Sequence, residues 1–229
     1  MGQGLATLIV KDGKGVLYDT GASWDSGSMA QLEILPYLRR QGIQLEWLIL
    51  SHDDNDHSGG ARAMLSAYPD IQLTTASQKR YGEKNTTEND RTFCLAGKQW
   101  TWQGLRFTVL SPNNIVPRAE NPDSCTLLLT DGKHHILLTG DADLSVEYKI
   151  LPKLDKIHVL QVGHHGSKTS TGEALVRHIQ PDIALISSSR WNPWHFPHQT
   201  VVDRLTQHHA QLYNTAEDGQ IRLLFEKND

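Results

Sequence analysis

Side chains that can bind metal ions are concentrated in one short segment, HDDNDH at residues 52–57. In an extended loop, residues two apart project to the same side, so His52, Asp54 and Asp56 can converge while His57 follows on the opposite side. Imidazole and carboxylate groups together suit borderline to hard divalent ions such as zinc or manganese. The segment therefore predicts a metal centre.

Two later apolar runs also end in side chains of this kind. Asp141 follows residues 137–140, and the pair His164-His165 follows residues 159–163. The end of a buried strand is a rigid place for a ligand. Three runs that all end in this way favour one shared centre over three unrelated solvated loops.

The elements that must position these residues can be identified from apolar runs and turn signals. Residues 47–50 form a continuous apolar run, typical of a strand buried on both faces, which leads directly into His52. Residues 157–162 form a second such strand. Ser58-Gly59-Gly60 permits a close turn into a helix over residues 61–68.

The rest of the chain alternates between short strands and helices. The first helix is expected over residues 29–41, with Leu32, Leu35 and Leu38 on one face, and residues 82–91 are expected to be a polar loop. The count predicts an α/β protein, an αββα four-layer sandwich formed as a single domain over residues 1–229. Further strands are expected over residues 5–10, 15–19, 71–75, 98–110, 126–130, 136–139, 183–187 and 221–225, and further helices over 173–179, 200–208 and up to Leu151.

Composition limits the classes of partner. The chain has 229 residues, 38% of them hydrophobic and 21% charged, which is ordinary for a globular protein with a substantial core. A net charge of −4 provides no overall positive field for nucleic acid, so any phosphate affinity must be local, and bound divalent cations could supply it.

Cysteines and apolar runs give further limits. Cys94 and Cys125 are too few for a disulfide framework and lack the spacing of a thiolate zinc site, which leaves buried small side chains or one disulfide. No apolar run approaches the ~20 residues needed to cross a bilayer, so this stretch is expected to be soluble. Because it opens directly into a core strand, we expect it to be part of a longer protein.

The motifs resemble those of a known superfamily. His52-x-Asp54-x-Asp56-His57 followed by Gly59-Gly60 resembles the signature of metallo-β-lactamase-fold hydrolases, with Asp54 in place of the second histidine of the commoner form. That replacement, together with Gly-Gln-Gly at residues 2–4 and the motifs at 138–141 and 162–167, resembles the nuclease-like soluble domain of ComEC DNA-uptake proteins. The resemblance covers nearly the whole chain.

This resemblance implies a set of ligands for two divalent ions, Mn²⁺ or Zn²⁺. Asp141 is expected to bridge the ions. Of the two adjacent histidines, His164 is the expected ligand because it comes first off its strand, which leaves His165 to contact the substrate. One ion is then held by His52, Asp54 and Asp141, and the other by Asp56, His57, Asp141 and His164.

The chain departs from the superfamily pattern at two places. Residues 121–124 read Asn-Pro-Asp-Ser where a further histidine is common, so the first site is rich in oxygen ligands and favours manganese. Phe196 stands where related domains have the histidine of Gly-His-Pro. His195 or His198 could take over its role as phosphate contact or general acid, or could be a plain surface histidine.

Two other polar segments have alternative interpretations. Asp19 could hydrogen-bond a ligand histidine and fix its tautomer, or could cap a turn. Residues 167–170, Ser-Lys-Thr-Ser, could hold a phosphate beside the metals or could be a solvated loop.

The resemblance implies a metal-dependent nuclease, with DNA single strands or ends as the substrate and Asp56 orienting the nucleophile. The activity would degrade the non-transported strand during DNA uptake. The alternatives are hydrolysis of another ester or lactone bond, and a non-catalytic module that binds DNA through metals. A ComEC-like parent implies an inner-membrane protein with this domain in the periplasm or outside the cell, next to the remainder of a DNA-uptake channel, and leaves the oligomeric state open.

Overall fold

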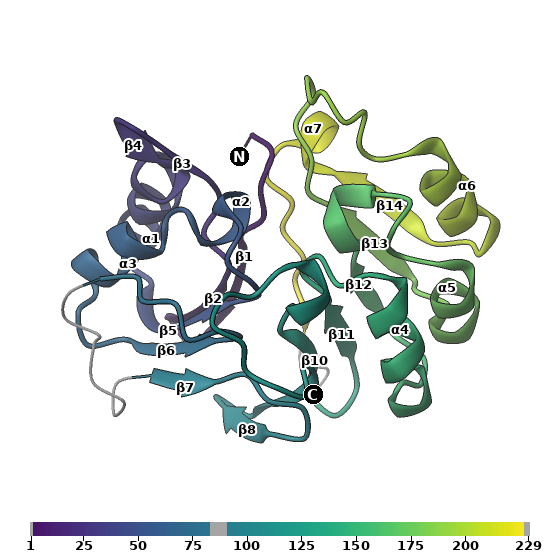
Figure 1. Cartoon of the computed structure of the whole chain (residues 1–229), viewed down its shortest axis with the longest axis horizontal. Helices are drawn as coiled ribbons and strands as arrows, with labels where there is room; N and C mark the ends of the chain where they lie inside the picture. The colour runs from purple at the N-terminus through teal and green to yellow at the C-terminus, as the bar shows by residue number, and fades with distance from the viewer. Residues whose placement is uncertain (1, 83–90, 227–229) are drawn as a thin grey trace.

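The computed structural model of the chain describes residues 2–82 and 91–226. Two β-sheets lie side by side, and helices cover the outer face of each (Figure 1). This arrangement confirms the predicted α/β sandwich.

The first sheet has the strand order β1-β2-β5-β6-β7. Strands β1 and β2 form an antiparallel hairpin, whereas β2, β5, β6 and β7 run parallel to one another. A separate small hairpin contains β3 (Ser23–Trp24) and β4 (Gly27–Ser28). The strands of the sheet are β1 (Thr7–Lys11), β2 (Lys14–Tyr18), β5 (Gln44–Leu50), β6 (Gln72–Thr75) and β7 (Arg91–Phe93).

The second sheet has the order β14-β13-β12-β11-β10-β9-β8. The strands from β8 to β11 are antiparallel, and those from β11 to β14 are parallel. They are β8 (Gln99–Trp102), β9 (Leu105–Ser111), β10 (Thr126–Thr130), β11 (His135–Leu138), β12 (Val159–Gln161), β13 (Ile183–Ile186) and β14 (Gln211–Asn214).

Helices lie on both outer faces and at the strand ends. In the described part of the chain, no helix is long and apolar enough to cross a membrane. The α-helices are α1 (Leu35–Gln41), α2 (Asn55–Ser58), α3 (Ala61–Ala67), α4 (Leu144–Ile150), α5 (Glu173–Ile179), α6 (Gln199–Gln207) and α7 (Thr215–Asp218). The other helical turns are the π-helix η1 (Ala30–Ile34) and the 3₁₀-helices η2 (Asn121–Asp123), η3 (Leu151–Lys153) and η4 (Gly163–Gly166).

Strand alternation distributes the apolar side chains among three buried clusters. Val16 and Tyr18 of β2 pack between the sheets, whereas Leu17 packs under α1 and α3. Leu127 of β10 likewise belongs to the cluster between the sheets, and Leu160 of β12 to the cluster under α4, α5 and α6. Three clusters between four layers are what an αββα sandwich requires.

The helix predicted over residues 29–41 is present, but the place of Leu32 on its buried face is wrong, and so is the last predicted strand. The first helix begins as the π-helix η1, whose wider turn shifts the buried face, so that Ala30 and Ile34 are buried and Leu32 is 60% exposed. Residues 221–225 form no strand, and Leu224 is 72% exposed. The last strand is instead β14, which pairs with β13. Most of the loop predicted at residues 82–91 lies outside the described residues, and Arg91 already belongs to β7.

A disulfide joins the two sheets. Cys94 follows β7 in the first sheet, and Cys125 precedes β10 in the second. Both residues are fully buried in the cluster between the sheets. Of the two possibilities left by the sequence, the structure has the disulfide.

Reduction of this bond is expected to lower the midpoint of thermal unfolding by about 10 °C. The bond spans a sequence separation of 31 residues, and closing such a loop stabilises a protein by about 3 to 4 kcal/mol. In a chain of this size each kcal/mol corresponds to about 2 to 4 °C. Calorimetry with and without reductant measures the shift, and a Cys94→Ala, Cys125→Ala double variant should not respond to reductant. An unchanged midpoint in a sample with both thiols free would contradict the prediction.

Candidate metal centre

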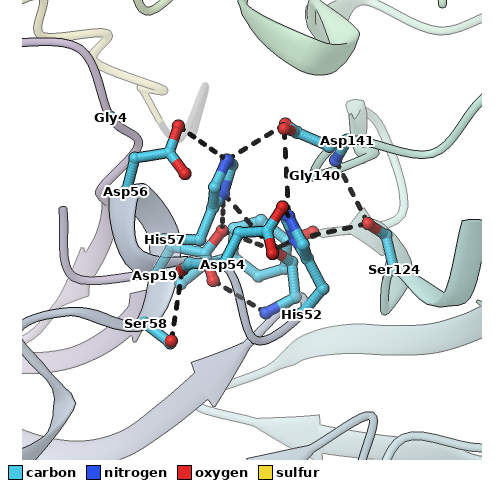
Figure 2. A network of polar contacts seen from close by, with 12 residues as sticks. Gly4, Asp19, His52, Asp54, Asp56, His57, Ser58, Ser124, Gly140 and Asp141 are labelled. Carbon is cyan, nitrogen blue, oxygen red and sulfur yellow. Dashed lines mark hydrogen bonds and ion pairs between the residues drawn. The ribbon is translucent and has the colours of Figure 1, made fainter. Parts of the chain in front are cut away.

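The predicted side chains lie at the carboxyl ends of parallel strands in both sheets. Asp19 follows β2 and His52 follows β5, while Asp141 follows β11 and the pair His164-His165 follows β12. The carboxyl ends of parallel strands meet at one edge of a sheet, where open α/β proteins form their sites. The loops that follow these strands come from both sheets and meet in one centre (Figure 2).

The segment at residues 52–57 is extended only in its first half. Asp53 points away from the centre: its carboxylate accepts hydrogen bonds from the hydroxyls of Ser77 and Tyr81 and from the backbone of Ala119. Asp54 then has extended backbone angles and begins α2. Because α2 is a helical turn, Asp56 and His57 both reach the centre, so the expectation that His57 lies on the opposite side is wrong.

Two groups of possible metal ligands share His57. Carboxylates lie close to the histidine nitrogens: Asp54 Oδ2 is 3.5 Å from His52 Nε2, and Asp56 Oδ2 is 3.0 Å from His165 Nε2. Figure 2 shows Asp56, His57 and Asp141 pointing toward one another. One group contains His52, His57 and Asp141, and the other contains Asp56, His57 and His165, with the ligand atoms of each within 4.8 Å of one another.

Asp141 belongs to the first group and also lies close to the second, with its Oδ2 3.8 Å from His165 Nε2. Its Oδ1 is 3.1 Å from His57 Nε2, and its Oδ2 is 3.9 Å from His52 Nε2. The turn that carries it is held by the buried side chain of Gln161, whose Oε1 accepts hydrogen bonds from the backbone of Thr139 and Gly140. Burial alone would raise the pKa of Asp141, but the neighbouring histidines outweigh this and lower it. The residue is therefore a carboxylate held in a position from which it could bridge two ions.

Hydrogen bonds fix the tautomers of two histidines. Asp19 is fully buried and accepts a 2.7 Å hydrogen bond from His57 Nδ1, the contact predicted as one of its two possible roles. The backbone oxygen of Ser187 accepts a 2.7 Å hydrogen bond from His165 Nδ1. Because these oxygens are acceptors, the ring hydrogens of the neutral histidines lie on Nδ1, and both Nε2 atoms present a lone pair.

These lone pairs face each other and two carboxylates. His57 Nε2 and His165 Nε2 are 3.2 Å apart, with Asp141 and Asp56 oxygens at 3.1 and 3.0 Å from them, respectively. Among the described residues, His52 Nε2 and Asp141 Oδ1 are also buried without a hydrogen-bond partner. Such a cluster of acceptors requires positive charge, which a divalent ion would supply, and imidazole with carboxylate suits Zn²⁺ or Mn²⁺. The residues present therefore fit the divalent metals that the fold implies.

The pKa values of His57 and His165 also indicate that this cluster favours positive charge. Burial alone would lower the pKa of His57, but the charges of Asp141 and Asp19 outweigh this and raise it well above its usual value. Burial would likewise lower the pKa of His165, but the hydrogen bond to Asp56 raises it. A metal ion at this position would replace those protons.

The adjacent histidines occupy different positions. His165 is 3% exposed and lies in the group with Asp56 and His57. His164 is half-buried, its Nδ1 lies 3.3 Å from the hydroxyl of Thr169, and its Nε2 is 3.7 Å from Asp141 Oδ2. Both have left-handed backbone angles, so the chain turns sharply and order along the chain does not decide which side chain enters the centre. The geometry favours His165, rather than the predicted His164, as the ligand.

The histidines after β13 lie outside both groups. The side chain of Asn192 closes this loop through hydrogen bonds to the backbone of Phe196. His195 is exposed, and His198 begins α6 with its backbone bonded to Gly166. No hydrogen bond or ion pair joins the rings of these two histidines to another described residue. Phe196 instead lies beside His164, with ring centroids 5.6 Å apart.

Sequence reasoning missed several of the contacts that hold the centre. The hydroxyl of Ser51 donates to Asp19 at 2.6 Å and lies 2.9 Å from His52 Nδ1. Ser124 Oγ accepts a 3.2 Å hydrogen bond from the backbone of Asp141. The position of Ser51 directly before the first motif could have indicated its role. The Ser187 carbonyl has no signal in the sequence because any residue type carries that oxygen.

The chain is similar to known proteins along its whole length. The profile described as "Metallo-beta-lactamase superfamily" matches residues 1–190. The chain is 60% identical over 225 residues to "Recombination protein 2" of Haemophilus influenzae, an alignment that covers 98% of this chain and 28% of that protein. It is 30% identical over 226 residues to "Competence protein ComA" of Neisseria gonorrhoeae, covering 96% of this chain and 31% of that protein. The chain thus spans less than a third of either relative.

Among solved structures, a metallo hydrolase from the archaeon Ignicoccus hospitalis resembles the fold. The TM-score is 0.66 at 12% sequence identity, and the match covers 98% of this chain and 97% of that one. At this identity the likeness extends to the fold alone.

Proposed function

Because the chain belongs to the metallo-β-lactamase superfamily, we propose that it is a dinuclear metal-dependent phosphodiester hydrolase that cleaves DNA during DNA uptake. The observation that carries the proposal is the pair of adjoining ligand groups, which share His57 and contain no cysteine. The names of two relatives, a competence protein and a recombination protein, support DNA as the substrate. The proposed activity degrades the strand that is not transported.

The ligand set follows the predicted one with a single change. Asp141 would contribute to both ions, and His165 takes the place of His164, because its Nε2 faces Asp56 and His57. The carboxylates of Asp54 and Asp56 make both sites rich in oxygen and support manganese as well as zinc. The first ion would be held by His52, Asp54 and Asp141, and the second by Asp56, His57, Asp141 and His165.

The chain's own groups orient the reaction. Two divalent ions bound by these residues would supply activation of water and stabilisation of the attacking and leaving oxygens of a phosphodiester. Asp19 holds His57, and Ser187 holds His165, so their Nε2 atoms keep fixed directions. Asp56, half-exposed beside them, orients the nucleophile. His164 remains on the rim and is the histidine placed to contact the substrate, with His198 as a second candidate.

The disulfide supports a location outside the cytoplasm, since such bonds persist in oxidising compartments. Both relatives are more than three times as long as the matched region. We place this domain in the periplasm, attached to the membrane-embedded remainder of a DNA-uptake protein.

Incubation of the chain with labelled single-stranded and duplex DNA is the test. Wild type is expected to cleave DNA with added Mn²⁺ or Zn²⁺, to lose all cleavage with chelator, and to regain it on metal readdition. Asp56→Ala should remain folded and cleave at a rate at least about a hundredfold lower, because one ligand and the orientation of the nucleophile are removed. Equal cleavage by this variant would contradict the proposal. Turnover of generic esters or lactones without DNA cleavage would favour another bond, and DNA binding without cleavage a non-catalytic module.

A further inference from the structure

A pocket rich in cationic side chains adjoins the metal centre. Its cavity volume is about 390 Å³. One wall is the motif segment itself, through Asp53 and Asn55 and through Ser58 at the end of α2. Four cationic residues from three separate segments of the chain also line the pocket, Arg62, Lys79, Arg80 and Arg118.

The charge of this pocket is not neutralised by its own acidic residue. Both oxygens of Asp53 already accept hydrogen bonds from Ser77, Tyr81 and Ala119, and the side chain is 3% exposed. Neither Arg62 nor Arg80 forms an ion pair with any carboxylate among the described residues. The described residues of the pocket therefore offer a positive local field in a chain whose net charge is −4.

The contacts of two cationic residues of the pocket show that it lies close to the metal centre. Lys79 Nζ donates a 3.2 Å hydrogen bond to the backbone oxygen of Asp53 and lies 5.0 Å from the ring centroid of Tyr81. Arg118 lies 3.7 Å from Asp54 Oδ1, and Asp54 in turn lies beside His52. An anion in the pocket would thus be a near neighbour of the ion held by His52 and Asp54.

Exposed aromatic side chains lie on the other side of the centre, in the loop of residues 191–196. Trp191 is 90% exposed and Trp194 is 56% exposed. The rings of Trp194 and Phe196 are nearly parallel, with centroids 6.2 Å apart, and Phe196 adjoins His164. Large aromatic groups exposed on a closed loop present flat faces on which bases can stack.

We propose that a single-stranded nucleic acid crosses the metal centre. The cationic pocket binds one of its phosphates, other than the one that is cleaved, and one of its bases stacks on Trp194. The inference rests on the proposed function and specifies its substrate. A cationic groove combined with aromatic faces is the pattern by which proteins hold single strands without regard to sequence. In a duplex the bases already stack on one another, so the aromatic loop would have no free base to bind.

The test measures binding, so that it does not depend on turnover. The probe is a labelled phosphorothioate oligothymidylate of about 10 nucleotides, within the range of single-strand site sizes, titrated with metal-loaded protein across several salt concentrations. The double variant Arg62→Ala, Arg80→Ala should bind the probe about tenfold more weakly. In a plot of log affinity against log salt concentration, its slope should be shallower by about 0.7 for each phosphate that the protein no longer neutralises. Trp194→Ala should bind roughly tenfold more weakly with an unchanged salt dependence.

Matched controls lie on α4, whose residues line neither the cationic pocket nor the aromatic loop. Lys149→Ala removes an exposed cation and Tyr148→Ala an exposed aromatic ring, and both should bind like wild type. Variants of the pocket and loop that match these controls would overturn the inference, as would tighter binding of a duplex of equal length. If these variants bind the probe more weakly but the wild type does not cleave DNA, the proposed binding of a single strand would be supported and the proposed catalysis rejected.

Discussion

Replacement of Asp141 by asparagine is expected to reduce kcat/KM toward DNA by at least about a thousandfold. The proposed bridging carboxylate contributes to both ions, and such ions account for several kcal/mol of stabilisation of the transition state. Asparagine keeps the size of a side chain that is 3% exposed, so the loss should come from charge rather than from packing. Elemental analysis of the purified variant should show fewer than two equivalents of metal, and steady-state cleavage of labelled DNA gives the rate.

Asp143→Asn is a suitable control because it makes the same change two residues away. Asp143 caps α4 by accepting a hydrogen bond from the backbone of Val146, and asparagine caps helices equally well. This variant should keep its metal and its activity. An Asp141→Asn variant that retained full metal content and wild-type cleavage would disprove the bridging role.

Alanine substitution of the adjacent histidines should have unequal effects. His165→Ala is expected to weaken binding of one ion at least about a hundredfold, since even residues that only orient a ligand change metal affinity by roughly 10- to 100-fold. His164→Ala should leave metal content unchanged and raise KM for DNA, because His164 lies half-buried on the rim beside Phe196.

Competition with a chromogenic chelator measures the two metal affinities, and circular dichroism checks that each variant is folded. Loss of metal from His164→Ala but not from His165→Ala would restore the ligand predicted from chain order. Equal losses from both would mean that the two rings share the ion.

The sequence was sufficient to predict the fold and the region of the centre. Apolar runs such as Trp47–Leu50 mark buried strands, and a ligand-type residue at the end of each run must lie at a sheet edge. The tautomer-fixing contact of Asp19 could also be anticipated because Asp19 directly follows β2, the neighbour of β5. These predictions depend only on the order of residues along the chain, which is known from the sequence.

Features that depend on backbone direction or distant contacts were not predictable in this way. Left-handed angles at His164 and His165 decide which ring enters the centre, and the π-helix before α1 exposes Leu32. The cationic pocket unites Arg62 and Arg118, which are brought together only by the tertiary fold. The apolar run at 221–225 resembles a strand but pairs with no described strand.

The division of the centre between the two sheets has a consequence for the maturation of the chain. His52, Asp54, Asp56 and His57 follow β5 of one sheet, whereas Asp141 and His165 follow strands of the other. With the proposed ligands, neither half of the molecule holds a complete set for either ion. Binding of both metal ions therefore requires that the two sheets have packed together. A chain in which Cys94 and Cys125 have formed their disulfide, but in which the ligands of the two sheets have not come together, would be crosslinked and unable to bind the ions.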